Sequence, residues 1–248
     1  MLLNVAYDVL PKQLSVHSAL VMDHFGVGFD TGRHVIAENV ELPIQPGDVV
    51  LFTGPSGSGK SSLMRAAAAA LGVSAVLNID TLELGERILV DGLDRPADET
   101  FALLTCCGLG EARLMLRCPA ELSDGQRYRY RLALAFSKSP AWIVADEFTA
   151  TLDRTLAKVI AFNLGKTARR RETGLLLATT HDDIAEDLNP DVHVDCRLDG
   201  EVEVERRVIK KKSSALPAKS NLRPARNAIG RTSLGGIIAA TTSASSAG

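Results

Sequence analysis

Residues 54–61 read Gly-Pro-Ser-Gly-Ser-Gly-Lys-Ser, and they decide the expected fold. They fit the pattern G-x-x-x-x-G-K-[ST] between an apolar run at 49–52 and an alanine-rich stretch at 61–71. The first is typical of a buried parallel strand, and the second predicts a helix ended by Gly72. Glycines let backbone N–H groups surround phosphates, and the helix start adds partial positive charge. The stretch therefore predicts a phosphate-binding loop, and its setting disfavours a chance glycine-rich turn.

Side chains of this loop have expected chemical roles. Lys60 can reach the β- and γ-phosphates of a nucleotide, and Ser61 can bind Mg²⁺ through its hydroxyl. The other nucleotide-binding positions are expected to be Gly54, Pro55, Ser56, Gly57, Ser58, Gly59 and Ser62.

Two apolar strands downstream end in residues suited to hydrolysis. Asp146 and Glu147 follow the apolar run 142–145, so both carboxylates should emerge at the sheet edge beside the phosphates. Asp146 can hold Mg²⁺ through water, and Glu147 can polarise the attacking water as a general base. His181 ends the apolar strand 175–180, where it can donate a hydrogen bond to the γ-phosphate. A solvated acidic strand end and a structural histidine are the alternatives, which the phosphate loop disfavours.

A second phosphate-binding feature is the stretch Leu122-Ser123-Asp124-Gly125-Gln126. It opens a helix expected over 126–137, capped by Ser123 or Asp124. Ser123 and the N–H groups around Gly125 form a second anion-binding helix start. One chain cannot easily bring this helix to its own phosphate loop, whereas a second copy can. An ordinary capped helix would be favoured if the stretch stood alone.

Together these motifs resemble the ATP-binding cassette (ABC) ATPases over roughly residues 20–205. In that resemblance, 54–61 is the Walker A loop, 122–126 is the signature, and 142–146 followed by Glu147 is the Walker B strand. Ala150-Thr151-Leu152-Asp153 resembles the D-loop, for which Leu152 and Asp153 are the candidate residues, and His181 resembles the switch histidine.

The resemblance implies an α/β P-loop fold with a mostly parallel sheet flanked by helices, a small antiparallel β subdomain and a reduced helical lobe. It also implies ATP hydrolysis with Mg²⁺ and a head-to-tail homodimer, in which Ser123 of one copy meets the γ-phosphate held by the other. Phe29 is the expected adenine-stacking aromatic, and Phe25 is the alternative.

Three departures from the family bear on the process coupled to ATP. The interval 62–122 is short for a transporter cassette, and it lacks the Q-loop glutamine that normally couples the nucleotide site to a transmembrane partner. Asp124 replaces a signature glycine, and its charge would slow closure unless it points to solvent. These features favour an ATPase that is not a conventional transporter subunit. The alternatives are a transporter nucleotide-binding subunit and an ATP-regulated, nucleic-acid-associated module.

A finer resemblance concerns the stretches 108–112 and 178–192. They look like a prokaryotic soluble subgroup in which the cassette is joined to an acetyltransferase-like domain. The implied partner is acetyltransferase-like or another effector, and a membrane partner is disfavoured. We find no acetyl-CoA motif in 213–248.

Composition sets further expectations. The chain has 248 residues, 46% of them apolar, which suffices for one large α/β core. No run of about 18 apolar residues would span a bilayer, and no secretion signal is recognisable, so we expect a cytoplasmic protein. Cys106 and Cys107 are interpreted as buried free thiols, with a redox or metal pair as the alternative.

The charge distribution, together with the extent of the ABC resemblance over roughly residues 20–205, suggests three segments. From Arg206 onward there are nine Lys and Arg and no acidic residue. We therefore expect a segment 1–19, an ATPase domain 20–205, and a basic tail 206–248 that is disordered or a remnant of a second domain. The tail could bind nucleic acid, although a solvated linker is the favoured interpretation. Other strands are expected at 35–36, 40–44, 73–79 and 87–90. Other helical segments are expected over 97–118, interrupted near Gly108 and Gly110, and over 154–171.

Overall fold

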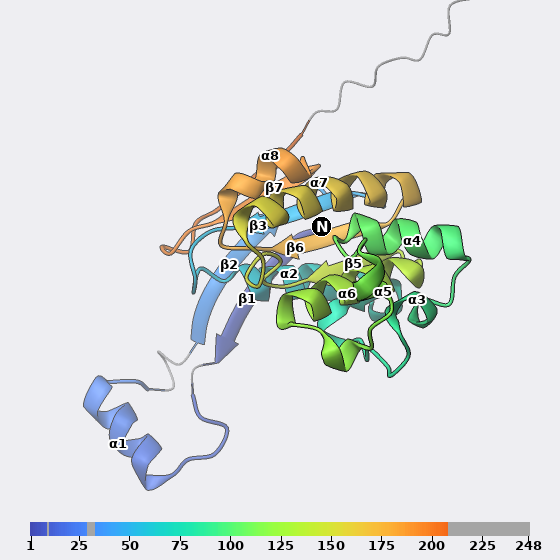
Figure 1. Cartoon of the computed structure of the whole chain (residues 1–248). Coiled ribbons are helices and arrows are strands. Elements are labelled where there is room, and N and C mark those ends of the chain that lie inside the picture. Colours follow the sequence, from blue (N-terminus) through green and yellow to red (C-terminus); the bar gives the residue numbers. More distant parts are fainter. Residues whose placement is uncertain (9, 29–32, 208–248) are drawn as a thin grey trace, which may run out of the picture. The chain divides into compact units, whose positions relative to one another are not determined.

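A computed structural model describes residues 1–8, 10–28 and 33–207. Its larger sheet has six strands in the order β4-β5-β6-β3-β7-β8 (Figure 1). They are β3 (Val49–Thr53), β4 (Val76–Asn78), β5 (Trp142–Ala145), β6 (Gly174–Ala178), β7 (Val192–Cys196) and β8 (Val202–Arg206). All pair in parallel except β8, which lies antiparallel to β7. Phe29 and the residues after Arg207, for which predictions were made, lie outside the described residues.

The central strands are apolar runs because helices cover both of their faces. Every residue of β3, β5 and β6 is buried, as expected for strands inside a parallel sheet. Leu177 of β6 pairs with Leu51 of β3 on one side and with Ala145 of β5 on the other. The C-terminal ends of the three strands therefore meet at one edge, and the predicted parallel sheet is confirmed.

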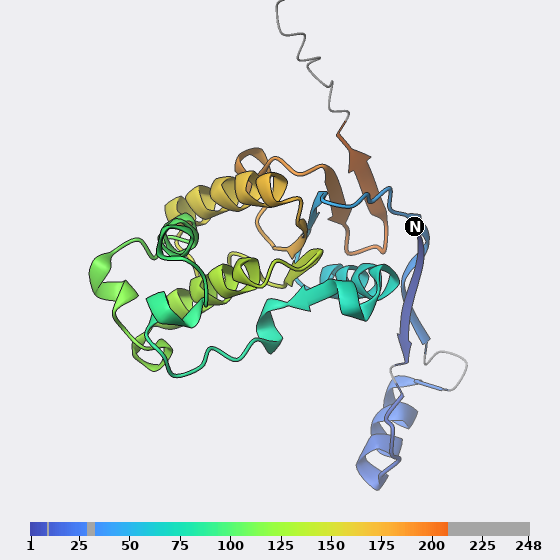
Figure 2. The ribbon, with the colours of Figure 1, turned by 90° about the vertical axis from the view of Figure 1, so that its right-hand side faces the viewer.

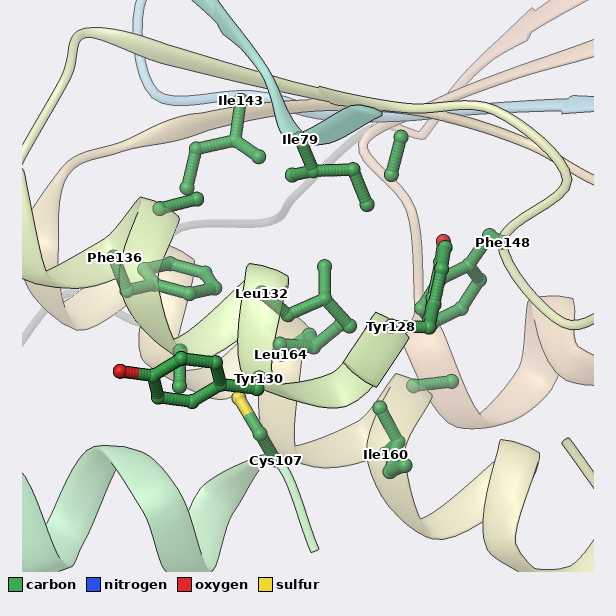
Figure 3. Packing of buried hydrophobic residues seen from close by; sticks show 14 of the residues in the cluster. Ile79, Cys107, Tyr128, Tyr130, Leu132, Phe136, Ile143, Phe148, Ile160 and Leu164 are labelled. Carbon is green, nitrogen blue, oxygen red and sulfur yellow. The ribbon is translucent and has the colours of Figure 1, made fainter. Parts of the chain in front are cut away.

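Alternate residues of these strands contribute to two separate cores. On one face, Leu51 and Ile143 join the cluster that includes α6 (Asp124–Ser137) and α7 (Arg154–Arg171), part of which is drawn in Figure 3. On the other face, Val50 and Phe52 pack with α2 (Lys60–Leu71). The predicted helices over 61–71, 126–137 and 154–171 are confirmed, each within one or two residues.

A small antiparallel sheet lies beside α2 (Figure 2). It consists of β1 (Leu2–Asp8) and β2 (Arg33–Glu41), which pair from Leu2 with Glu41 to Asp8 with Arg33. The two strands expected at 35–36 and 40–44 are thus mostly one strand. The sequence prediction separates 1–19 from the ATPase domain, whereas β1 supplies half of this sheet. At the other end, Arg206 closes β8 and pairs with Asp48 at 2.8 Å, so the strand extends past the expected boundary at 205.

A helix not expected from the sequence, α1 (Val16–Phe25), connects these two strands. Ser15 caps its start, accepting a hydrogen bond from the Ser18 N–H at 3.1 Å, and Gly26 ends it in the left-handed conformation. None of its residues is buried. Its apolar residues lack the spacing of one buried face, so periodicity gave no helical signal there.

The reduced helical lobe contains α3 (Leu89–Gly92), α4 (Ala97–Cys106), α5 (Ala112–Met115) and the start of α6. The predicted interruption of the helical stretch near Gly108 and Gly110 is confirmed. The strand predicted at 87–90 is wrong, because α3 begins at Leu89, in the middle of this segment, and no strand pairs with it. Leu89 is fully buried in the lobe, and a short apolar run suits a buried helical turn as well as a strand. The strand expected over 73–79 is confirmed only for the residues of β4. Farther along the chain, the short helix α8 (Ala185–Leu188) follows the 3-10 turn Asp182–Ile184.

Candidate nucleotide site

A cavity of about 470 Å³ opens where β3, β5 and β6 end. Its walls come from the phosphate loop, the ends of β5 and β6, the small antiparallel sheet and the β7–β8 connection. The lining residues named by the sequence prediction are Ser56, Gly57, Ser58, Gly59, Lys60, Ser61, Ser62, Asp146 and Glu147. The topology therefore brings together the predicted phosphate loop and both predicted carboxylates.

The phosphate loop is fitted tightly against the small sheet. Gly59 has φ of +86°, and a Cβ there would lie 2.2 Å from Cγ2 of Ile36 in β2. Both conditions require glycine. Inside the loop, the Ser58 hydroxyl is buried without a hydrogen-bond partner. A buried donor beside exposed backbone amides fits the oxygens of a phosphate, so the loop suits the predicted nucleotide.

The Lys60 ammonium group is held inside the loop. Its Nζ donates a hydrogen bond to the Pro55 carbonyl at 2.6 Å, and the residue is 7% exposed. Burial lowers the pKa of Lys60, while Cys196, Asp146 and Asp182 oppose the shift. The amine thus lacks a full counter-charge in this structure. A phosphate anion in the cavity would supply one.

Ser61 and Asp146 connect the loop to β5. The Ser61 hydroxyl donates to Asp146 Oδ1 at 2.9 Å. A hydroxyl and a carboxylate are oxygen ligands of the kind that Mg²⁺ prefers, and both line the cavity. The donor set therefore fits the Mg²⁺ expected at this point.

Glu147 is held in an uncommon backbone conformation. Its φ is +48°, a left-handed value rare for a residue with a side chain. The next residue fixes it, since the Phe148 N–H donates to the Ala178 carbonyl at 2.8 Å across to β6. Glu147 also donates its own N–H to Asp146 Oδ1 at 3.0 Å, and its side chain is exposed at the cavity. This geometry presents a carboxylate to the cavity rather than to the core.

The segment leading to His181 is tied to the same edge. Thr149 and Thr179 share a hydroxyl–hydroxyl hydrogen bond of 2.7 Å, and Thr179 also accepts the His181 N–H at 3.1 Å. Thr179 and Thr180 line the cavity, but His181 itself does not. The structure places His181 next to the site, half-buried, without bringing its ring into the cavity wall.

Two aromatic residues that the sequence analysis did not name line the cavity. Tyr7 at the end of β1 and His34 in β2 have ring centroids 5.1 Å apart. Their contact depends on the register of two strands that are far apart in sequence, which no local pattern reveals. Phe25, the alternative to Phe29 for stacking, is 72% exposed on α1 and does not line the cavity.

The β7–β8 connection also reaches the cavity, and the sequence analysis did not predict any of its residues as part of the site. Arg197, Leu198, Asp199 and Gly200 line it. Arg197 forms ion pairs with Glu203 at 2.6 Å and Glu201 at 3.3 Å, so its charge is largely balanced within the hairpin. The Asp199-Gly200 dipeptide is the turn signal that could have located this hairpin.

The predicted signature lies away from this cavity. Ser123 caps α6, and its hydroxyl accepts the Gln126 N–H at 3.3 Å while Gln126 Oε1 accepts the Ser123 N–H at 3.0 Å. None of Leu122, Ser123, Asp124, Gly125 and Gln126 lines the cavity. The Asp124 carboxylate is 84% exposed and pairs with Arg127 at 2.6 Å, so it points to solvent.

The predicted D-loop packs against the signature. A Cβ on Gly125 would lie 2.7 Å from the Thr151 carbonyl, so the two segments approach closely. Asp153 caps α7 by accepting the Leu156 N–H at 2.9 Å, and Leu152 packs against the larger core. Of the D-loop stretch, Ala150 lines the cavity, whereas Thr151 lies outside it, against the signature.

The neighbouring cysteines are free thiols. Cys107 is buried in the larger core, and Cys106 is half-buried with its Sγ 3.5 Å from the Thr167 hydroxyl. A hydrogen bond from Cys107 lowers the pKa of Cys106 to about 7, with Thr167, Arg170 and Arg171 contributing. Among the described residues, no group of three or more His, Cys, Asp and Glu side chains is arranged to hold a metal ion, so neither cysteine belongs to such a group.

The sheet, the phosphate loop and the carboxylates define an ATPase of the P-loop class. No family model matches the chain. The zinc import ATP-binding protein ZnuC of Cereibacter sphaeroides is 31% identical over 169 residues, which are 61% of this chain and 68% of that protein. The lipoprotein-releasing system ATP-binding protein LolD of Novosphingobium aromaticivorans is 27% identical over 186 residues, which are 60% and 83% of the two chains.

A solved structure shows the same fold. The ATP-binding cassette MJ0796, in a dimeric post-hydrolysis state with ADP and Pi, aligns with a TM-score of 0.57 at 20% identity. The alignment covers 83% of this chain and 97% of that one. This chain belongs to the ATP-binding cassette (ABC) family, and it is an ATPase. Within the described residues, no helix is long and apolar enough to cross a membrane.

Proposed function

We propose that this chain is the ATP-hydrolysing subunit of a transporter and that it works as a head-to-tail homodimer. The observation that carries the dimer is the separation between the cavity and the signature. The cavity contains the phosphate loop, Asp146 and Glu147, but no residue of 122–126. A second copy, docked head to tail, can place its Ser123 and the first turn of α6 over this cavity.

The residues of the cavity divide the chemistry of hydrolysis. Lys60 and the amides of the loop hold the phosphates, and the buried Ser58 hydroxyl donates to a phosphate oxygen. Ser61 and Asp146 would hold Mg²⁺, which supplies charge neutralisation at the phosphates. Glu147 accepts a proton from the attacking water as general base, and His181 approaches the γ-phosphate when the dimer closes. Tyr7, rather than Phe25, stacks on the adenine because it lines the cavity.

The relatives favour a transporter subunit over a free-standing ATPase. One relative named above belongs to a lipoprotein-releasing system and the other to zinc import. The short helical lobe and the lack of a glutamine in 62–122 favour the free-standing ATPase. Both features concern how the nucleotide site would be coupled to a membrane partner, and neither excludes such a partner. The partner on this proposal is a membrane protein.

Two narrower alternatives have less support. The relatives named above offer nothing for a subgroup joined to an acetyltransferase-like domain, so we propose no such partner. A nucleic-acid role would rest on the basic residues after Arg207, which lie outside the described residues. It would require binding that falls steeply with salt and disappears when 208–248 are deleted.

The catalytic assignment is tested by ATP turnover of wild type and Glu147→Gln. We expect the substitution to lower kcat by at least about a hundredfold, because the general base is lost. The same variant should accumulate as an ATP-bound dimer in size-exclusion chromatography. Equal turnover in the two proteins would overturn the role of Glu147.

The transporter role is tested separately. The tagged Glu147→Gln variant would be isolated from mildly solubilised membranes in the presence of ATP. The control is Lys60→Ala, which should not bind ATP and should therefore not form the closed dimer. Enrichment of an integral membrane protein with the first variant alone supports the proposal. Recovery of the ATPase only in the soluble fraction, with full turnover, contradicts it and favours the free-standing ATPase.

A further inference from the structure

Two side chains on one side of α6 each carry a buried polar atom without a hydrogen-bond partner. Among the described residues, four buried side-chain polar atoms have none, and two of these are the Tyr128 hydroxyl and the Arg131 Nε. The two residues are three positions apart, so they share a helix face. Burying a polar atom without a partner costs free energy, because contact with water is lost and not replaced. On this face of α6 the Tyr128 hydroxyl and the Arg131 Nε–H are therefore donors that no other protein group in the described part of the chain uses.

This face of α6 lies against the end of β4. Asn78 pairs with Val144, so Asp80 and Asp146 each follow two residues beyond the last pair of two neighbouring parallel strands. The 3-10 turn η2 (Ile79–Thr81) contacts both β5 and α6. Figure 3 shows Ile79 pointing toward Leu132, the residue after Arg131. The topology thus brings Asp80 to the same edge as the Walker B carboxylates.

The charges at this edge act on one another. Partial burial raises the pKa of Asp80, Asp146 and Glu147 add to the rise, and Arg131 opposes it. Burial also raises the pKa of the Tyr128 hydroxyl, and the same three carboxylates add to that shift. Tyr128 therefore remains a neutral hydrogen-bond donor. Arg131 is the cation that opposes both shifts.

We propose that Arg131 and Tyr128 are positioning residues for ATP hydrolysis that act through Asp80 on the Walker B carboxylates. Arg131 offsets the charge of Asp80, which would otherwise repel Asp146 and Glu147. Glu147 is the next residue after Asp146 and lines the cavity, so its carboxylate lies at this same edge. Tyr128 offers a donor to the same group of carboxylates.

The position of α6 gives this arrangement a further consequence. The helix starts at the signature, which on the proposed function meets the ATP of the second copy. About two turns later, the same helix presents Tyr128 and Arg131 to its own Walker B edge. A movement of α6 when the dimer closes would therefore change the electrostatic potential at the Glu147 carboxylate of the same chain. The inference rests on the proposed function, since it assumes hydrolysis at Glu147.

The test is a double-mutant cycle on kcat with Asp80→Asn and Arg131→Met. Each single change leaves an unbalanced charge at the edge, and we expect kcat to fall about tenfold in each. The double variant removes both charges, so kcat should return to within about threefold of wild type. KM for ATP should stay within about twofold throughout, because neither residue lines the cavity. Arg131→Lys, which keeps the charge, should retain most of the activity.

A matched control uses an exposed ion pair of the same lobe. Arg87 and Asp94 pair at 2.7 Å with both side chains exposed. Arg87→Met, Asp94→Asn and their double variant should leave kcat unchanged. Each variant is first checked for folding by its thermal midpoint, so that kcat is counted per folded protein.

Tyr128→Phe separates positioning from packing. It removes only the hydroxyl that lacks a partner, so a residue that serves packing alone would become more stable and keep its activity. We expect a thermal midpoint that is unchanged or higher, together with a kcat about three- to tenfold lower.

The outcomes distinguish this inference from the proposed function. Losses in the two single variants that simply multiply in the double variant would overturn the proposed electrostatic coupling of Asp80 with Arg131. Full activity of Tyr128→Phe would overturn its positioning role. Both results can occur in a protein that hydrolyses ATP through Glu147, whereas failure of the proposed function would appear as equal turnover of wild type and Glu147→Gln.

Discussion

The Ser61 hydroxyl donates a 2.9 Å hydrogen bond to Oδ1 of Asp146, joining the first residues of α2 to the end of β5. The same oxygen accepts the Glu147 N–H at 3.0 Å. One carboxylate thus sets the position of the expected metal ligand and of the expected general base. This contact gives the first prediction.

Ser61→Ala should weaken activation by Mg²⁺. The hydroxyl is one of the two side chains expected to hold the ion, and losing it also frees Asp146. We expect kcat at low Mg²⁺ to fall by at least about tenfold, with partial recovery at high Mg²⁺. A Mg²⁺ titration of ATP turnover provides the measurement. Ser74→Ala, in the exposed turn after α2, is the matched control; an unchanged Mg²⁺ dependence of Ser61→Ala would contradict the assignment.

The parts of the site that could be predicted from sequence are those encoded locally. The phosphate loop follows one apolar strand, and Asp146 and Glu147 follow another. The ends of neighbouring parallel strands share an edge, so these residues meet whatever the details of packing. Ser123 or Asp124 was predicted as the cap of α6, and Ser123 is the residue that accepts the N–H of Gln126, three residues away.

The parts that could not be predicted depend on contacts between distant segments. Tyr7 reaches the cavity only because β1 pairs with β2, and the exposed residues of β1 give no alternating pattern. Asp80 reaches the catalytic edge through the register of β4 on β5. The prediction of a strand at 87–90 failed for a different reason, since three apolar residues are too few to separate a strand from a buried helical turn.

Tyr7→Ala should weaken nucleotide binding. Stacking of a base on an aromatic ring contributes roughly 1–3 kcal/mol, so we expect Kd for ATP to rise about five- to a hundredfold. Fluorescent-nucleotide titration would measure it, with Phe101→Ala on α4 as a control that should bind normally. If Phe25→Ala weakens binding and Tyr7→Ala does not, the adenine lies elsewhere.

Asp124 in the signature should be less harmful than its charge suggests. Its carboxylate pairs with Arg127 at 2.6 Å and is 84% exposed. Exposed pairs contribute about 0.2–1 kcal/mol, so Asp124→Gly should speed ATP-dependent dimer formation by no more than about fivefold. Arg127→Ala leaves the charge unpaired and should slow dimer formation.

The double variant Asp124→Gly/Arg127→Ala supplies the control for this pair. It carries neither charge and so has the same local net charge as the intact pair, and its rate of dimer formation should be close to that of the wild type. Stopped-flow light scattering would follow the three variants. A large acceleration by Asp124→Gly alone would mean that the carboxylate faces the incoming phosphate in the dimer.

Lys60→Met should stabilise the nucleotide-free protein while abolishing ATP binding. Burial lowers the pKa of Lys60, so the folded chain holds the charged amine less readily than the unfolded chain does. Below the lowered pKa the amine is charged in both states, and the full cost of burying that charge is present. As pH rises from that value toward 10.5, the folded state releases its proton first, and the stability of the wild type increases.

The thermal midpoint of Lys60→Met should therefore exceed that of the wild type by about 2–5 °C at pH 7, and the difference should shrink as pH rises toward 10.5. ATP should raise the midpoint of the wild type but not that of the variant, because a bound anion supplies the missing counter-charge only when Lys60 is present. Differential scanning calorimetry from pH 7 to pH 10, with and without ATP, measures both effects. Lys158→Met, on the exposed side of α7, tests whether any lysine loss has the same result. A destabilised Lys60→Met protein at pH 7 would show that the Pro55 contact outweighs the cost of burial.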